Sequence, residues 1–155
     1  MRALVQRVTR AEVRSRIEPD GVLVPVGAIA AGLCVLVGVT HSDSGDAARA
    51  LARKVAGLRV FDDDDGVMNL AAPEVGAGFL VVSQFTLYGS TDRGRRPSWV
   101  DAARPEVAEP LVGLFVAALR EIADETGAVV ETGRFRTEME VELVNDGPVT
   151  LVVEA

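Results

Sequence analysis

The sequence predicts an α+β fold in which a mostly antiparallel, curved or barrel-like sheet carries two packed helices. Three observations lead to this prediction. Short runs of Val, Leu and Ile, separated by turn residues, indicate strands over most of the chain. Two segments, 44–58 and 105–127, instead repeat apolar residues at helical spacing. Residues 138–144 alternate apolar and acidic side chains, which is typical of an antiparallel strand with one face in water.

Strands and one helix are expected in the first half of the chain. Residues 2–8 and 22–26 read as strands joined through a turn at 18–21. The unbroken apolar run 32–39 predicts a strand that is covered on both faces. A helix should then begin at Ser44, whose hydroxyl suits an N-cap. The four aspartates of "FDDDDG", 61–66, lack the ligand spacing of a calcium loop and predict a solvated turn.

The second half should begin with a buried strand at 79–89 that ends in polar residues. The second helix should begin near Pro105 and stop at Gly127. Pro110 is expected to bend it or to delay its first turn. Residues 138–144 and 149–153 should pair with each other as a hairpin, although the Gly-Pro at its tip removes a backbone donor.

Length and composition predict one domain over residues 1–155. Hydrophobic residues make up 48% of the chain and charged residues 25%, as in globular proteins. No apolar run approaches the roughly 18 residues that a membrane span needs. The N-terminus reads as a strand and not as a signal peptide, so a cytoplasmic protein is expected. Cys34 lies within an apolar run and predicts a buried structural thiol.

The net charge of −7 disfavours broad, sequence-blind binding of nucleic acid. The arginines are nevertheless clustered, and one cluster lies in the Gly- and Pro-containing stretch "DRGRRP". A loop of this composition is free to wrap an anion. Arg93, Arg95 and Arg96 are therefore candidate contacts for phosphate groups.

The residue inventory excludes several familiar active sites. A zinc site needs several His or Cys ligands, and the chain has one of each, His41 and Cys34. No glycine-rich run ends in Gly-Lys-Ser/Thr, and no GxGxxG opens a helix. No cofactor or tightly bound metal is therefore expected. A pair of carboxylates brought together by the fold stays open.

Ser83, Gln84, Phe85 and Thr86 follow a buried strand, a usual position for a site in a sheet protein. The simplest interpretation is that these hydroxyls satisfy local backbone groups. Thr86 has no adjacent base, so a catalytic site here would use backbone dipoles in preference to a side-chain relay. A serine esterase that pairs Ser83 with His41 is an alternative.

Seven segments, in this order, resemble the D-aminoacyl-tRNA deacylases, the D-tyrosyl-tRNA(Tyr) deacylase family. They are "QRV" (6–8), "GLCVLVGV" (32–39), "MNL" (68–70), "LVVSQFTL" (80–87), "GRRPSW" (94–99), "TGRF" (132–135) and "LVNDGPVT" (143–150). The resemblance runs almost end to end, and the pairing of SQFT with the distant NDGPVT is its most specific part. One departure is Trp99, which stands where the family usually has phenylalanine.

The resemblance implies a homodimeric enzyme that hydrolyses the ester of D-aminoacyl-tRNA, with active sites at the subunit interface. Glycyl-tRNA mischarged on tRNA(Ala) would also be a substrate, because glycine has no side chain to reject. In the family the peptide that corresponds to Gly147-Pro148 is cis, enters the partner's pocket and excludes L-aminoacyl esters.

The resemblance also implies roles for single residues. Catalysis is assigned to the pocket residues Ser83, Gln84, Phe85 and Thr86, and support of the Gly-Pro peptide to Arg7, Met139 and Asn145. The three loop arginines would contact tRNA. A tRNA acceptor-end binding protein without catalysis is the alternative.

Overall fold

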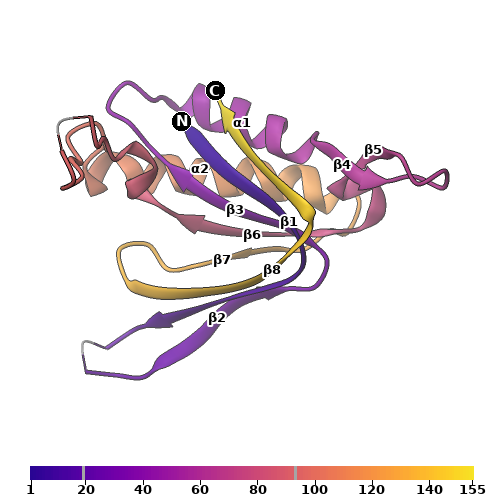
Figure 1. Cartoon of the computed structure of the whole chain (residues 1–155), viewed down its shortest axis with the longest axis horizontal. Helices are drawn as coiled ribbons and strands as arrows, with labels where there is room; N and C mark the ends of the chain where they lie inside the picture. The colour runs from indigo at the N-terminus through magenta and orange to yellow at the C-terminus, as the bar shows by residue number, and fades with distance from the viewer. Residues whose placement is uncertain (19, 93) are drawn as a thin grey trace.

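The computed structural model describes residues 1–18, 20–92 and 94–155, so the predicted tRNA contact Arg93 lies outside the described residues. Its elements, shown in Figure 1, are β1 (Arg2–Arg16), β2 (Leu23–Ile29), β3 (Gly32–Gly38), α1 (Gly45–Ala56), β4 (Arg59–Asp62), β5 (Met68–Ala71), η1 (Ala72–Val75), β6 (Gly78–Ser83), η2 (Phe85–Tyr88), α2 (Pro105–Asp124), β7 (Val130–Thr132) and β8 (Glu138–Glu154). The two η elements are short 3₁₀ helices. No helix in these ranges is long and apolar enough to cross a membrane.

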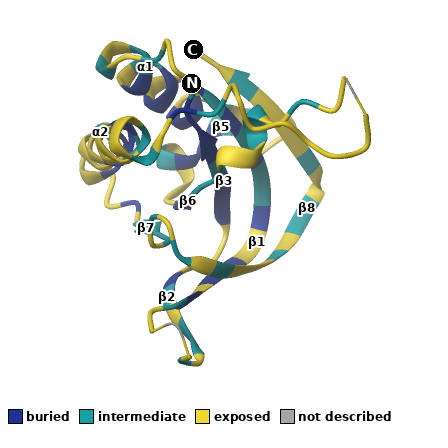
Figure 2. Ribbon diagram, turned by 90° about the vertical axis from the view of Figure 1, so that its left-hand side faces the viewer, coloured by how far each residue is buried: buried dark blue, intermediate teal, exposed yellow. Residues whose placement is uncertain are grey.

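One curved sheet forms the body of the protein, in the order β2-β1-β3-β6-β7, with β8 also paired to β1. The first half of β1 lies between β3 and β8, and its second half lies between β2 and β8. The pairs β3–β6 and β6–β7 are parallel, and the other pairs of this sheet are antiparallel. Figure 2 shows the sheet curling while both helices lie on one side of it. The predicted α+β class and barrel-like sheet are confirmed.

Two apolar layers explain why β3 reads as an unbroken apolar run. On one face of the sheet, Leu33, Val35 and Val37 pack with α1 and α2 around Phe79 and Phe115. On the other face, inside the curl, Cys34 belongs to a smaller cluster with Val8, Ala11, Val13, Ile29, Leu80 and Val82. Both faces of β3 are therefore covered, as predicted.

The helices begin where the sequence predicts. The Ser44 hydroxyl accepts a hydrogen bond from the Ala47 N–H, 3.3 Å away, and caps α1. Pro105 is the first residue of α2, a position where the missing N–H has no intrahelical partner. Pro110 lies within α2 and does not delay its start. Its missing N–H frees the carbonyl of Glu106, an exposed residue that water can solvate.

The acidic segment 61–66 includes the end of β4 and the turn of the β4–β5 hairpin, which projects from the body in Figure 1. Asp63 organises this turn by accepting hydrogen bonds from the backbone of Val67 and Asp65 and from the Asn69 amide. These bonds, chiefly the one from Val67, lower the pKa of Asp63. Within the described ranges, no group of three or more His, Cys, Asp or Glu residues could hold a metal ion.

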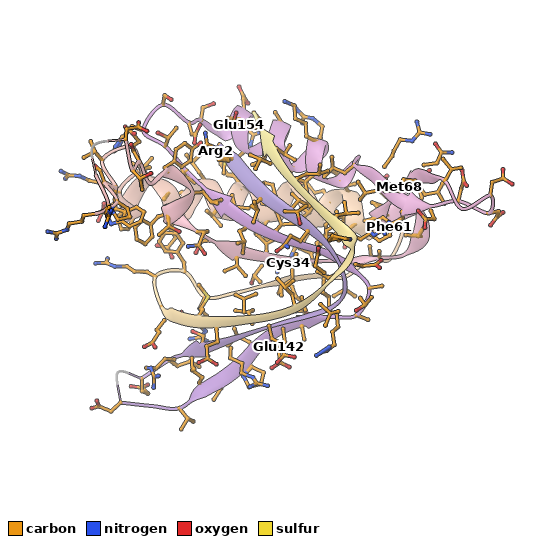
Figure 3. The ribbon with its side chains drawn as sticks, viewed as in Figure 1. Arg2, Cys34, Phe61, Met68, Glu142 and Glu154 are labelled. Carbon is orange, nitrogen blue, oxygen red and sulfur yellow. The ribbon has the colours of Figure 1, made fainter. Side chains whose placement is uncertain are left out.

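The predicted C-terminal hairpin is wrong, because its two halves form one long strand and both pair with β1. Residues 150–154 pair with residues 2–6, and residues 138–144 pair with residues 10–16. Arg2–Glu154 and Arg10–Glu142 ion pairs mark the two halves, at Nη2–Oε1 distances of 2.6 and 2.7 Å. Figure 3 labels Arg2 and Glu154 from the first pair and Glu142 from the second. Since β1 has 15 residues, it is long enough to serve as the pairing partner of both halves.

Gly147-Pro148 lies in a bulge between the two halves of β8. The pairing moves from Gln6–Thr150 to Val8–Asn145, so residues 146–149 stand opposite Arg7 alone. Extra residues of this kind leave the ladder and bend the strand, as Figure 1 shows for β8. Pro148 is tolerated because its position in the bulge needs no ladder donor.

Candidate functional site

The chain changes direction at the end of the buried strand β6 and opens a cleft there. Residues 78–82 are buried, and Ser83 is partly exposed. The Gln84 N–H donates to the Val37 carbonyl at 2.7 Å, which keeps the chain attached to β3 for one more residue. The short 3₁₀ helix η2 follows. Its first N–H groups, at Phe85 and Thr86, donate to no backbone carbonyl in the described part of the chain.

This cleft has a volume of about 640 Å³, within the range of small-molecule sites. Its wall is mostly apolar and comes from β3, β6, the start of α2, and the segment that enters β8. The lining residues used below are Ser83, Gln84, Phe85, Trp99, Ala102, Phe135, Arg136, Thr137 and Met139. A few polar groups in an apolar cleft can orient a ligand that packing alone would hold loosely.

The structure places three of the four predicted SQFT residues on the cleft wall. Ser83, Gln84 and Phe85 line the cleft, whereas the exposed Thr86 does not. The Gln84 amide donates to the Thr86 hydroxyl, so that hydroxyl is engaged within its own turn. Met139 also lines the cleft, from β8, and its sulfur lies against Gly133.

Neither Ser83 nor Cys34 has the surroundings of an activated nucleophile. The described part of the chain gives the Ser83 hydroxyl no hydrogen-bonded base. His41 is outside the cleft lining, and its Nε2 lies 2.8 Å from the Val100 carbonyl oxygen. A carbonyl only accepts, so Nε2 carries the proton and cannot take one from serine. Burial raises the pKa of the Cys34 thiol to about 11, and this thiol is structural, as predicted.

Sequence reasoning missed the segment 135–137, which forms one side of the cleft. Thr137 anchors it, because its hydroxyl lies 2.6 Å from the hydroxyl of the fully buried Ser15 and also donates to the Arg134 carbonyl. Arg136 has a φ of 59°, a left-handed conformation that costs a non-glycine residue roughly 1–2 kcal/mol. No local pattern predicts an arginine in this conformation, which stands next to the contact of Thr137 with Ser15 of β1.

The Gly147-Pro148 bulge is a second, separate candidate region. Both residues are exposed, and neither lines the cleft of its own chain. Their peptide bond is cis, and Gly147 has a φ of 112°, which disfavours any side chain there. Asn145 closes the base of the bulge by donating to the Arg7 and Val149 carbonyls, each at 3.0 Å.

Arg7 fills the space beneath this bulge. Its side chain is only 11% exposed, and Nη1 donates to the Val60 carbonyl at 2.5 Å. Its Nε lies 3.1 Å from an Asp146 carboxylate oxygen, although without the alignment of a hydrogen bond, and Asp62 is 3.7 Å from Nη1. A buried guanidinium with two carboxylates and a carbonyl around it is held firmly. Arg7 therefore fixes the bulge against the β4 strand.

Two of the remaining predicted contacts lie in the loop that carries the lining residue Trp99. Arg95 and Arg96 are exposed in this loop, residues 94–100. Arg136, which is also exposed, lines the cleft from the segment 135–137. These exposed cations stand out in a protein whose net charge is −7.

Comparisons with known proteins find relatives that match this chain over nearly its whole length. The family described as D-Tyr-tRNA(Tyr) deacylase matches residues 4–154. A D-aminoacyl-tRNA deacylase from Symbiobacterium thermophilum is 54% identical over 155 residues, covering 100% of this chain and 96% of that protein. Another, from Anaeromyxobacter dehalogenans, is 52% identical, with coverages of 100% and 97%. The solved structure of a c-Myc DNA Unwinding Element Binding Protein superposes with a TM-score of 0.87 at 35% identity, with coverages of 100% and 99%.

Proposed function

Because this chain belongs to the D-Tyr-tRNA(Tyr) deacylase family and is an ester hydrolase, we propose that it releases D-amino acids from mischarged tRNA. The observation that carries the proposal is the cleft at the end of β6. It is lined by Ser83, Gln84 and Phe85, and its volume suits a nucleoside that bears an aminoacyl group. The reaction would take place in the cytoplasm, where charged tRNA is used.

We expect water, and not a side chain, to attack the ester. In the described part of the chain Ser83 has no hydrogen-bonded base, and His41 does not line the cleft. The 2′-hydroxyl of the terminal ribose is both donor and acceptor and can take part in proton transfer. Water adds to the carbonyl carbon, the ester C–O bond breaks, and the ribose oxygen leaves with a proton. Positioning alone can contribute about 7 kcal/mol or more to such a step.

Free backbone donors would supply the positioning. The N–H groups of Phe85 and Thr86 have no backbone acceptor in the described part of the chain and belong to the turn that borders the cleft. Donors of this kind stabilise charge that develops on a carbonyl oxygen. This role requires the turn and not the Ser83 hydroxyl, which distinguishes it from a serine esterase.

Selection against L-amino acids is assigned to Gly147-Pro148 of a second copy of the chain. The bulge is exposed and lies outside its own cleft, yet Arg7 and Asn145 hold it rigidly. We place its carbonyl groups where the side chain of an L-aminoacyl ester would lie, so that this side chain is rejected by clash and lost solvation. A D side chain would point away, and glycine would also be accepted, including on tRNA(Ala).

A homodimer would bring the bulge and the cleft together. The outer edge of β8 pairs with no other strand of the described sheet, and the strand also exposes the side chains of Val141, Val144, Leu151 and Val152. Long apolar edges of this kind are usually covered. Met139 lies on the same strand and lines the cleft, so it would touch the partner's bulge.

Single-turnover hydrolysis of matched D-, L- and glycyl-tRNA tests the proposal. Rapid loss of the D and glycyl esters with a stable L ester is expected. Equal cleavage of D and L esters would support the hydrolase activity but contradict the role of Gly147-Pro148. Tight binding of tRNA without cleavage of any ester would instead support an acceptor-end binding protein.

A further inference from the structure

Trp99 lies on the rim of the cleft and packs directly over Gly89. A Cβ atom built at Gly89 would lie 2.3 Å from Cζ3 and 2.9 Å from Cε3 of the Trp99 ring. The backbone angles of Gly89, φ −73° and ψ 130°, suit any residue. Glycine is therefore needed here for space, because any side chain would displace the indole.

Phe85 meets the indole from the side of the SQFT turn. The two ring centroids are 5.4 Å apart and the rings are inclined by 71°, an edge-to-face contact. Both side chains are substantially exposed, at 57% for Phe85 and 42% for Trp99. A single exposed aromatic ring is common on protein surfaces, but two in contact at the opening of a cleft indicate a binding surface.

Positive charge accompanies these rings. Arg95 and Arg96 lie in the same loop as Trp99, four and three residues before it, and both are exposed. The protein as a whole carries a charge of −7, so this loop differs from the average surface. Aromatic rings beside arginines are the combination by which proteins bind single-stranded nucleic acid, with bases on the rings and phosphates on the cations.

We propose that Trp99 stacks on the base of the nucleotide that precedes the terminal adenosine of the tRNA. This inference rests on the proposed function and adds a second nucleotide subsite to it. The cleft, at about 640 Å³, has room for one aminoacyl-nucleoside, so the preceding nucleotide must lie at the rim. Its base meets Trp99, and its phosphate lies toward Arg95 and Arg96. Phe85 and Gly89 are the positioning residues of the indole.

Substrates of two lengths separate this subsite from the rest of the cleft. The test compares kcat/KM for a D-aminoacyl-adenosine with kcat/KM for the same ester on the trinucleotide CCA. Trp99→Ala is expected to lower the trinucleotide value more than the nucleoside value, by a further factor on the order of tenfold. Trp99→Leu should do the same, since it keeps apolar bulk over Gly89 but cannot stack, and Trp99→Phe should retain most of the preference.

Two neighbouring variants complete the design. Gly89→Ala should reduce the trinucleotide preference as Trp99→Ala does, because the new Cβ displaces an indole that is still present. Val100→Ala removes an apolar side chain that is 77% exposed in the same loop, and it should keep the wild-type ratio. Thermal midpoints measured for every variant show whether each is folded.

The outcomes separate the subsite from the proposed function. Equal losses on both substrates in folded Trp99→Leu, or no loss on either, would overturn the stacking role. A folded wild-type protein that cleaves neither ester would contradict the deacylase itself.

Discussion

Ser83–Thr86 and Gly147-Pro148 occupy opposite settings in the same protein. The first follows a strand buried on both faces and borders a cleft built by apolar packing. The second lies in the middle of an exposed strand and is held by Arg7 and Asn145 through charge and hydrogen bonds. The cleft therefore depends on packing. The bulge, which we propose selects the substrate, depends on backbone geometry and a few polar contacts.

The largest effect is expected at Gly147. Gly147→Ala places a Cβ 2.8 Å from Val149 Cγ2 at a φ of 112°, so the bulge must move. A displaced bulge would press on the ester bound in the partner's cleft. Since displacements of the reacting groups near 1 Å can cost about 100-fold, we expect a loss of that order in single-turnover hydrolysis of the D ester. Gly127→Ala is the matched control, because Gly127 has a φ of 73° and a Cβ built there meets no atom of the described residues within 4 Å. It should lose stability and keep its activity, and equal losses in the two variants would contradict the account.

Arg7→Met tests what holds the bulge. The Val60 carbonyl loses a charged donor, which should cost about 1–3 kcal/mol of unfolding free energy in urea titrations. Hydrolysis of the D ester should fall by about tenfold, because the bulge loses its anchor. Arg10→Met is the comparison, since Arg10 is 59% exposed and its pair with Glu142 should contribute less than about 1 kcal/mol. Similar stability changes in the two variants would show that Arg7 is no more than a surface charge.

The pH dependence of stability tests whether Cys34 is buried in the packed core. Its ordinary pKa of 9.0 is raised to about 11 by burial, so between these values the folded protein keeps a proton that the unfolded chain has lost. The free energy of unfolding therefore falls as pH rises from the lower to the higher of these pKa values. The loss due to Cys34 is about 1 kcal/mol at about pH 10. Urea unfolding of wild type and Cys34→Ala at about pH 8 and about pH 10 measures this difference. An identical pH dependence in both proteins would show that the thiol is not shielded.

Ser83→Ala should have the smallest effect on catalysis. The serine hydroxyl has no hydrogen-bonded base among the described residues, so its removal should lower single-turnover hydrolysis by less than about tenfold. The measurement is the rate of hydrolysis of the D ester at saturating enzyme. A loss of about 1,000-fold or more would identify Ser83 as a nucleophile and would contradict attack by water.

Local patterns predicted the buried part of the protein well. The apolar run of β3, the Ser44 cap and the helical stripe that begins at Pro105 each depend on residues that are close in sequence. The SQFT residues were placed at the end of a buried strand for the same reason, and three of them line the cleft.

Nonlocal pairing explains what the sequence could not predict. Residues 138–144 and 149–153 look like a hairpin because each has strand character and a turn stands between them. Only the length of β1 makes them one strand. The left-handed Arg136 and the contact between Arg7 and the Val60 carbonyl likewise arise from segments far apart in the chain. No pattern within a short window contains them.

Subunit complementation tests the central claim most directly, namely that the cleft of one copy works with the bulge of another. Gly147→Ala displaces the bulge, and Ala102→Trp fills the cleft, so each variant alone should lose about 100-fold or more of its activity on the D ester. When equal amounts of the two variants are refolded together, random pairing should make half of the dimers mixed. Each mixed dimer has one intact site, so we predict about a quarter of wild-type activity. A mixture as inactive as its components would contradict the claim, because a site built within one chain cannot be restored by a partner.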